Sequence, residues 1–227
     1  MSCWICGNSA DTGEHMIKAS DLKALFGPTS QNKPLFRQIN SNSQEKVPGC
    51  RSEKLKFRTR LCACCNNTRT QSHDKSWEAL STYLRKRNPL VRPGDVVRVS
   101  HAFKSGVRPG FLGVHLYFAK LTGCLVLDAG VPLDIQSLAD AILQNSSHPH
   151  LYLSFLVLTD RRVHRHAFVT PIETIAVGGE LSGAQWYYLT GRIGVHVIYA
   201  KALHNREKRI HLWHPSNSEK TITLDGF

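Results

Sequence analysis

The chain has 227 residues, which is enough for one large domain or two small ones. Hydrophobic residues make up 41% of it and charged residues 20%, which excludes a mainly disordered chain, a collagen-like chain and a coiled coil. The net charge is +12, with +8 in residues 1–88 and +4 in residues 89–227. Concentrated positive charge favours nucleic acid as a partner, although a generally basic surface would give the same totals.

The sequence carries no uninterrupted apolar run of about 18 residues and no secretory pattern in its first residues, Met1-Ser2-Cys3-Trp4. We therefore expect a cytoplasmic protein that does not bind membranes. It has seven cysteines, an odd number. In a reducing compartment such a set favours metal binding over disulfide bonds.

The first part of the chain alternates between irregular and regular segments. Residues 28–54 are polar and have no clear period, so we expect a long irregular excursion. Residues 55–61 are typical of a short basic strand. Apolar side chains at helical spacing predict an amphipathic helix over residues 66–87, which Asn88-Pro89 ends.

From residue 95 onward, short apolar runs typical of strands become frequent. We predict a helix over residues 133–143 and strands over residues 96–99, 113–118, 151–158 and 195–199. The expected fold class is α+β, with one domain in residues 1–88 and a mixed, strand-rich domain in residues 89–227. The second domain resembles no known module. Its expected role is target recognition, or an interface with a partner or with a second copy in a homo-oligomer.

Two cysteine pairs, Cys3-x2-Cys6 and Cys62-x2-Cys65, have the spacing of zinc knuckles. Together they supply four thiolates for a tetrahedral structural Zn²⁺ site. Cys64 is the alternative ligand in the second pair. The 55 residues between the pairs are too many for a simple zinc finger, so the metal must close a loop that contains something else.

That loop contains an acidic residue directly before a histidine, Glu14-His15, and the second knuckle is followed by Asn66. This order resembles the zinc-bound members of the HNH endonuclease family, also called ββα-metal or His-Me finger nucleases. In them, a C-x2-C pair precedes an acidic residue and a histidine at the end of the first hairpin strand, and C-x2-C-Asn opens the helix. The resemblance covers about residues 1–87 and implies a ββα-metal fold for residues 1–88.

The resemblance also implies a role for each matching residue. Glu14 would be the acidic ligand of a catalytic Mg²⁺ or Mn²⁺, where many members have Asp or His, and His15 would be the general base. Asn66 would be a second metal ligand, with Asn67 as its rival. His73 would be a ligand, a phosphate contact or neither. Basic residues beside these elements would contact the nucleic-acid backbone: Lys18, Arg58, Arg60 and Arg69.

The expected function is metal-dependent hydrolysis of DNA phosphodiester bonds, with DNA ahead of RNA as the substrate, in restriction, phage defence or a mobile element. The chemistry agrees, because histidine can accept a proton near neutral pH and a divalent ion can neutralise charge on the phosphate. One alternative is a non-catalytic, zinc-containing nucleic-acid-binding protein. A second is that the C-terminal domain is the main functional unit, as a ligand sensor or an assembly interface.

Overall fold

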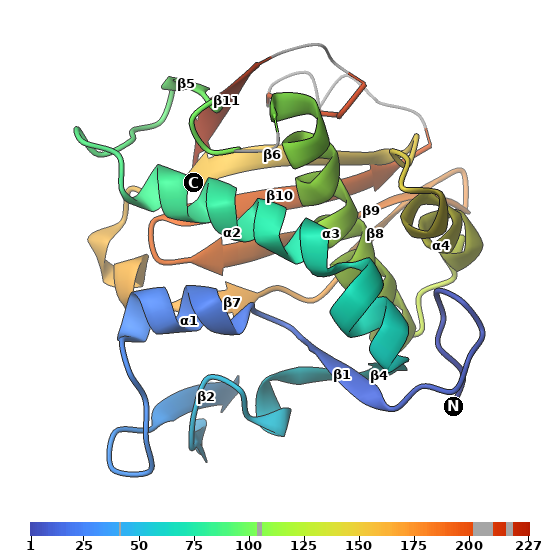
Figure 1. The fold of residues 1–227 in the computed structure, drawn as a ribbon, viewed down its shortest axis with the longest axis horizontal. Coiled ribbons are helices and arrows are strands. Elements are labelled where there is room, and N and C mark those ends of the chain that lie inside the picture. The colour runs from blue at the N-terminus through green and yellow to red at the C-terminus, as the bar shows by residue number, and fades with distance from the viewer. Residues whose placement is uncertain (41, 104–105, 202–210, 217–219) are drawn as a thin grey trace.

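The computed structural model describes residues 1–40, 42–103, 106–201, 211–216 and 220–227 (Figure 1). Its largest element is a seven-stranded sheet in the order β5-β11-β6-β10-β9-β7, with β8 also paired to β9. Only β11 and β6 run parallel within this sheet as described. Its strands are β5 (Val96–Arg98), β6 (Leu151–Val157), β7 (Ala167–Val169), β8 (Glu173–Val177), β9 (Glu180–Thr190), β10 (Ile193–Ala200) and β11 (Thr221–Gly226).

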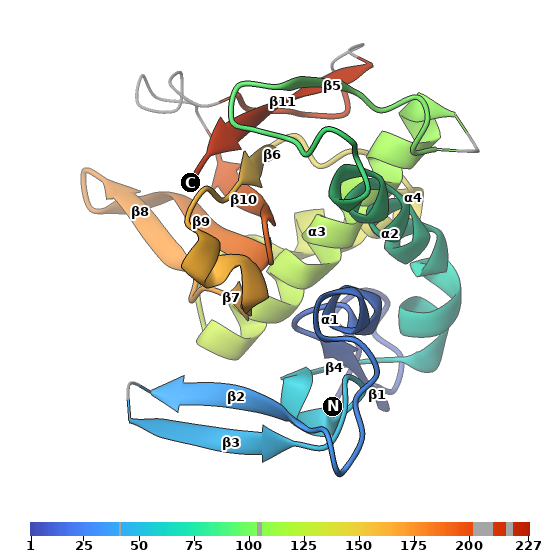
Figure 2. The ribbon, with the colours of Figure 1, turned by 90° about the vertical axis from the view of Figure 1, so that its left-hand side faces the viewer.

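The four α-helices lie on one face of this sheet (Figures 1 and 2). They are α1 (Ala19–Phe26), α2 (Gln71–Arg85), α3 (Val107–Ala129) and α4 (Ile135–Gln144). The Trp77 ring of α2 is fully buried at the centre of this layer. It meets the rings of Phe118 on α3 and Tyr188 on β9 edge to face, with ring centroids 5.0 and 5.6 Å away. These contacts join helices and sheet in one apolar layer.

Two small antiparallel sheets complete the fold. One pairs β1 (Thr12–His15) with β4 (Lys56–Leu61), and the π-helix η2 (Cys64–Arg69) then leads into α2. The other is the hairpin of β2 (Leu35–Asn40) and β3 (Ser43–Val47), which projects from the body (Figure 2). Two short 3₁₀ turns, η1 (Glu53–Leu55) and η3 (Arg161–Arg165), lie in the connections.

A continuous hydrophobic core joins the two regions into which the sequence is divided. Buried side chains from Cys3 to Leu224 belong to it, including those of α2 and α3. The boundary predicted at residue 88 falls in the loop after α2, but it does not separate two cores. The presence of both helices and strands agrees with the α+β fold class, whereas the two regions are not independent packing units.

Most predicted elements are confirmed. Residues 55–61 contain β4, residues 66–87 contain most of η2 and α2, and residues 133–143 fall on α4. The strands predicted from residues 96, 151 and 195 correspond to β5, β6 and β10.

The strand predicted over residues 113–118 is wrong, because this segment is the middle of α3. Neighbours surround the helix, so it is apolar on all sides and lacks the one-sided period that identifies a surface helix. Its glycines let it approach those neighbours closely. A Cβ atom at Gly113 would lie 2.3 Å from Ser76 Oγ, and one at Gly123 would lie 2.3 Å from the Trp4 ring.

The expectation of an irregular excursion over residues 28–54 is also wrong, because this segment contains the β2–β3 hairpin. Several of its strand residues are exposed polar side chains, so the alternation that marks a half-buried strand is weak.

By length and composition, α3 could cross a membrane, although it contains His115 and Lys120. However, 83% of its apolar window is buried inside the structure. In this fold α3 is the central core helix.

The buried carboxylate of Asp21 ties α1 to α2 and β9. Its Oδ2 accepts hydrogen bonds from the Trp77 indole N–H at 2.8 Å and the Tyr188 hydroxyl at 2.7 Å. Its Oδ1 accepts from Ser81 at 3.2 Å and from the Arg85 guanidinium at 2.8 Å. A carboxylate that is 1% exposed is stable there only because each oxygen is satisfied.

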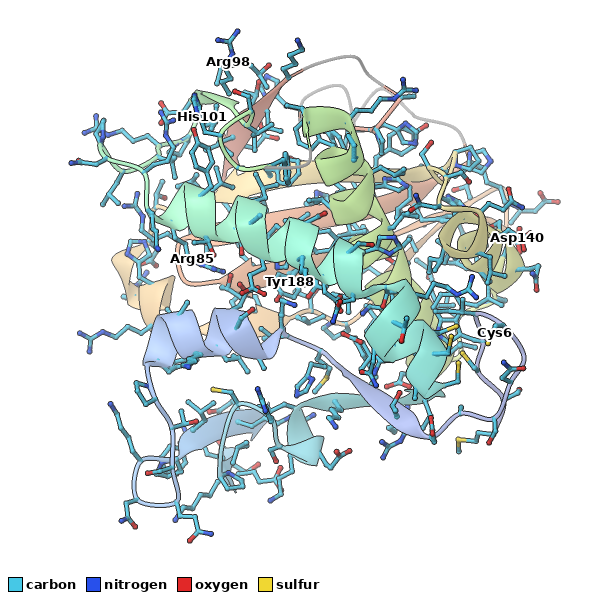
Figure 3. All side chains as sticks on the ribbon, viewed as in Figure 1. Cys6, Arg85, Arg98, His101, Asp140 and Tyr188 are labelled. Atoms are coloured by element: carbon cyan, nitrogen blue, oxygen red, sulfur yellow. The ribbon has the colours of Figure 1, made fainter. Side chains whose placement is uncertain are left out.

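We predict that Asp21→Asn lowers the free energy of unfolding by about 3 kcal/mol, since it leaves the Arg85 cation unpaired and presents N–H groups to other donors. Chemical denaturation of the zinc-loaded protein measures the loss. Asp140→Asn, on α4 far from Arg85 (Figure 3), should change stability by less than about 0.5 kcal/mol. Equal stability of the two variants would contradict the role of Asp21.

Candidate functional site

Four cysteines, two near the N-terminus and two after β4, come together beside the start of η2. The sulfur atoms of Cys3, Cys6, Cys62 and Cys65 all lie within 4.8 Å of one another, and they are largely buried. Four sulfur ligands at this spacing fit tetrahedral Zn²⁺. Cys64 is exposed and stands outside the group. The structure thus brings together the four predicted ligands, which could bind a metal such as zinc.

We predict that Cys65→Ser loses bound zinc and most of the cooperative unfolding transition, because metal binding to a small site contributes much of the local folding free energy. Cys64→Ser should keep one zinc per chain and the wild-type melting temperature. Elemental analysis of the purified variants, with thermal melts, checks both. Zinc retained by Cys65→Ser but lost by Cys64→Ser would reverse the ligand assignment.

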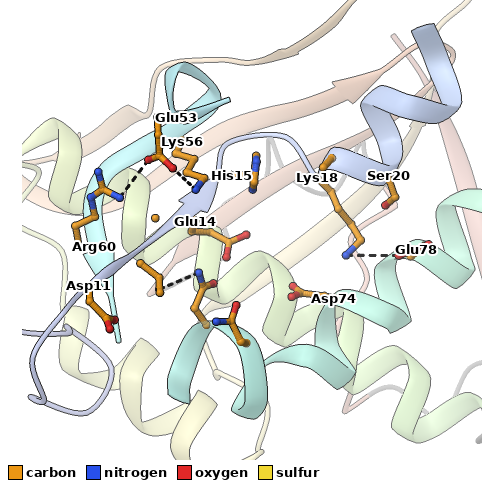
Figure 4. A pocket seen from close by; sticks show the side chains of 15 residues that line it. Asp11, Glu14, His15, Lys18, Ser20, Glu53, Lys56, Arg60, Asp74 and Glu78 are labelled. Carbon is orange, nitrogen blue, oxygen red and sulfur yellow. Dashed lines mark hydrogen bonds and ion pairs between the residues drawn. The ribbon is translucent and has the colours of Figure 1, made fainter. Parts of the chain in front are cut away.

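Next to the cysteines, residues from β1, α1, η1, β4, η2 and α2 line an open pocket of about 480 Å³ (Figure 4). Glu14 and His15 are neighbours on β1, and successive strand residues normally point to opposite faces. A bulge between Gly13 and His15 interrupts the pairing with β4. Both side chains therefore line the same pocket.

The surroundings of His15 disfavour its protonated form. Burial, followed by the nearby Lys56 ammonium, lowers its pKa to about 4. The imidazole is therefore neutral at pH 7. Among the described residues, none forms a hydrogen bond with its buried Nε2 atom.

Asn66 and Asn67 both line the pocket, so its lining does not choose between them as the metal ligand. Asn66 donates from Nδ2 to the Thr12 hydroxyl at 3.1 Å, which leaves its Oδ1 atom to act as an acceptor or ligand. Of the four basic residues predicted to contact nucleic acid, Lys18 and Arg60 also line the pocket. The Lys18 ammonium lies 3.6 Å from Glu78 Oε2.

The structure does not bring the other three predicted residues to the pocket. Arg58 donates to the backbone carbonyl of Asp128, and Arg69 is exposed outside the lining. His73 is buried on another side of α2, where its Nε2 lies 3.2 Å from Asn145 Oδ1, and it lines a separate pocket. We therefore leave His73 out of the candidate site.

Two charged residues next to Glu14 were not predicted from the sequence, namely Lys120 and Asp74. The ammonium of Lys120, on α3, donates to Glu14 Oε2 at 2.9 Å and to Asp74 Oδ1 at 2.8 Å. It also donates to the Thr70 hydroxyl at 3.2 Å. Asp74 lines the pocket next to Glu14. The only sequence signal for Lys120 was a lone cation inside a long apolar segment.

This cluster is held by mutual pairing. The Lys120 side chain is fully buried, whereas those of Glu14 and Asp74 are 11% and 21% exposed on the pocket side. The two carboxylates raise the pKa of Lys120 against the effect of burial, so its ammonium stays charged. Burial raises the pKa of Glu14, and the Lys120 ammonium opposes that rise. One buried cation thus pairs with two carboxylates, both of which line the pocket.

We predict that Lys120→Met lowers the free energy of unfolding by about 3 kcal/mol, because two carboxylates lose their shared cation. The triple variant Lys120→Met/Glu14→Gln/Asp74→Asn should recover part of that loss, since it removes the unpaired charges. Lys75→Met, at an exposed position on α2, is the control and should stay within about 0.5 kcal/mol of wild type. Denaturant titrations of all three provide the comparison. A triple variant less stable than Lys120→Met would contradict the charge-pairing account.

No protein family, curated protein or solved structure matches this chain. Interpretation of the site therefore rests on its own geometry and chemistry.

Proposed function

We propose that this protein is a metal-dependent endonuclease of the HNH type that hydrolyses DNA phosphodiester bonds. The observation that carries the proposal is the single pocket lined by Glu14, His15 and Asn66, beside the four cysteines. Strand β1 pairs with β4, and η2 and α2 follow β4, whereas α1 and the β2–β3 hairpin lie between the two paired strands. One cysteine pair precedes β1, and the other flanks the start of η2. The residues predicted to act on the phosphate that line this pocket are Glu14, His15, Asn66, Lys18 and Arg60, whereas His73, Arg58 and Arg69 lie outside it.

The oxygen atoms in the pocket fit Mg²⁺ or Mn²⁺. Lys120 contacts Oε2 of Glu14, which leaves Oε1 for a metal, and Asn66 can offer Oδ1. Within the described residues, the four cysteines are the only group of three or more Cys, His, Asp or Glu side chains that could hold an ion. An ion on Glu14 and Asn66 would therefore keep several waters, as Mg²⁺ usually does. When bound, it would supply charge neutralisation on the phosphate and on the leaving oxygen.

The protein's own groups account for the remaining requirements. His15 lines the pocket and is neutral at pH 7, so its imidazole is the group that would take a proton from the attacking water, although burial makes it a weaker base than a free imidazole. Lys18 and Arg60 line the pocket and pair there with Glu78 and Glu53, so they would hold the flanking phosphates by exchanging these carboxylates for phosphate oxygens. Lys120 is a positioning residue: it fixes the Glu14 carboxylate from beneath and contacts no solvent.

A second candidate function is a non-catalytic zinc module that binds nucleic acid. The observation that favours it is the Lys120 ammonium itself, which already gives Glu14 a cation partner at 2.9 Å. If that pairing replaces the divalent ion, the pocket would bind phosphate without cleaving it.

We predict that the zinc-loaded protein nicks supercoiled plasmid in Mg²⁺ or Mn²⁺ and that EDTA stops it. His15→Ala should reduce turnover by about 10²–10⁴-fold, because the general base is lost while the metal ligands remain. DNA affinity and Mn²⁺ affinity of this variant should stay within about twofold of wild type.

The matched control is His101→Ala, which removes an exposed histidine distant from the pocket (Figure 3). It should nick at the wild-type rate. Full activity of His15→Ala, or wild-type cleavage undiminished in EDTA, would overturn the proposed mechanism. DNA binding without any nicking would favour the non-catalytic candidate.

A further inference from the structure

The β2–β3 hairpin is a two-stranded ribbon whose two faces differ. Its ladder pairs Leu35 with Val47, Phe36 with Lys46, Arg37 with Glu45 and Gln38 with Gln44. Directly paired residues share a face, and faces alternate along each strand. Phe36, Gln38, Gln44 and Lys46 therefore lie on one face, and Leu35, Arg37, Glu45 and Val47 on the other.

The second of these faces is tied to the body of the protein. Val47 is fully buried, and the Arg37 guanidinium donates to the Lys54 carbonyl at 2.6 Å. The Lys54 ammonium lies 2.6 Å from a carboxylate oxygen of Glu45. These contacts fix the hairpin against the segment that follows it.

The first face is open. Phe36 is 64% exposed, which is unusual for a large aromatic side chain, and the three polar residues beside it are also exposed. This surface, made of Phe36, Gln38, Gln44 and Lys46, is called the ribbon face below. It offers the Phe36 ring, the Gln44 side-chain amide and the Lys46 ammonium, and no acidic group.

We propose that the ribbon face enters the major groove of the DNA duplex that the pocket acts on. This inference rests on the proposed function and adds to it the element that grips the duplex. A two-stranded ribbon fits the major groove, which is about 12 Å wide. Glutamine amides pair with adenine edges, lysine with guanine or phosphate, and an aromatic ring contacts the thymine methyl group.

Charge and position on the chain both favour DNA as the occupant. Residues 33–54 carry a net charge of +3. The segment after β3 leads directly into η1, where Glu53 lines the pocket, and Lys56 follows on its rim. A duplex held by the hairpin would therefore lie beside the pocket that contains His15. Figure 2 shows the hairpin projecting free of the main sheet.

The test compares Phe36→Ala, Gln44→Ala and Lys46→Ala with wild type in the full-length, zinc-loaded protein. Binding of a fluorescent 30-base-pair duplex is measured by anisotropy in Ca²⁺ at several salt concentrations, and plasmid nicking is measured in Mn²⁺. Each variant should weaken duplex binding at least about fivefold. Lys46→Ala, if its ammonium contacts a phosphate, should also reduce the salt slope by about one. Nicking at saturating DNA should persist, because the ribbon face does not touch the reacting atoms.

Arg98→Ala is the matched control, because Arg98 is an exposed cation on β5 at the opposite end of the molecule (Figure 3). It should bind the duplex as wild type does. Wild-type nicking together with unchanged affinity in all three hairpin variants would overturn this inference alone. Affinity for an RNA duplex equal to that for DNA would also overturn it, since side chains cannot read the deep, narrow major groove of A-form RNA. A wild-type protein that binds DNA through the ribbon face but never nicks it would overturn the proposed catalysis and leave the ribbon assignment standing.

Discussion

The buried ammonium of Lys120 is the constraint on which the candidate site depends. It comes from the central helix α3, yet its partners Glu14 and Asp74 belong to β1 and α2. Burying these three groups is favourable only while they pair, so the pocket floor and the core must form together. The same pairing fixes one oxygen of Glu14 and leaves the carboxylate open to the pocket. The geometry of the candidate site and the packing of the core are therefore coupled in this fold.

The cysteine cluster supplies the second anchor. Cys3 and Cys6 precede β1, and Cys62 and Cys65 flank the start of η2, so a metal among them would set the distance from Glu14 to Asn66. Zinc would hold the cysteine-bearing segments together, and Lys120 holds Glu14 and Asp74. Between these anchors the chain makes the excursion that carries α1 and the hairpin, which leaves room for a substrate-contacting element without disturbing the site.

The sequence predicted the features that depend on local spacing. Two cysteine pairs and the Glu14-His15 step lie within a few residues of the elements that hold them, so a pattern could identify them. A sequence pattern could not identify Lys120, because it lies 106 residues from Glu14 and no local spacing links the two. Helix α3 was mistaken in part for a strand because burial on all sides removes its period. His73 and Asp74 are adjacent, yet only Asp74 lines the pocket: one residue along a helix turns a side chain by about 100°.

Anomalous diffraction from Mn²⁺-soaked crystals of the zinc-loaded protein would test the central claim most directly, because it locates each metal independently of activity. The account predicts one zinc peak among the four cysteines. It also predicts a separate manganese peak in the pocket, on Glu14 and one of the two asparagines, with the Lys120 ammonium still on the other oxygen of Glu14. A pocket that stays free of manganese at saturating concentration, with Lys120 as the only cation beside Glu14, would contradict the account.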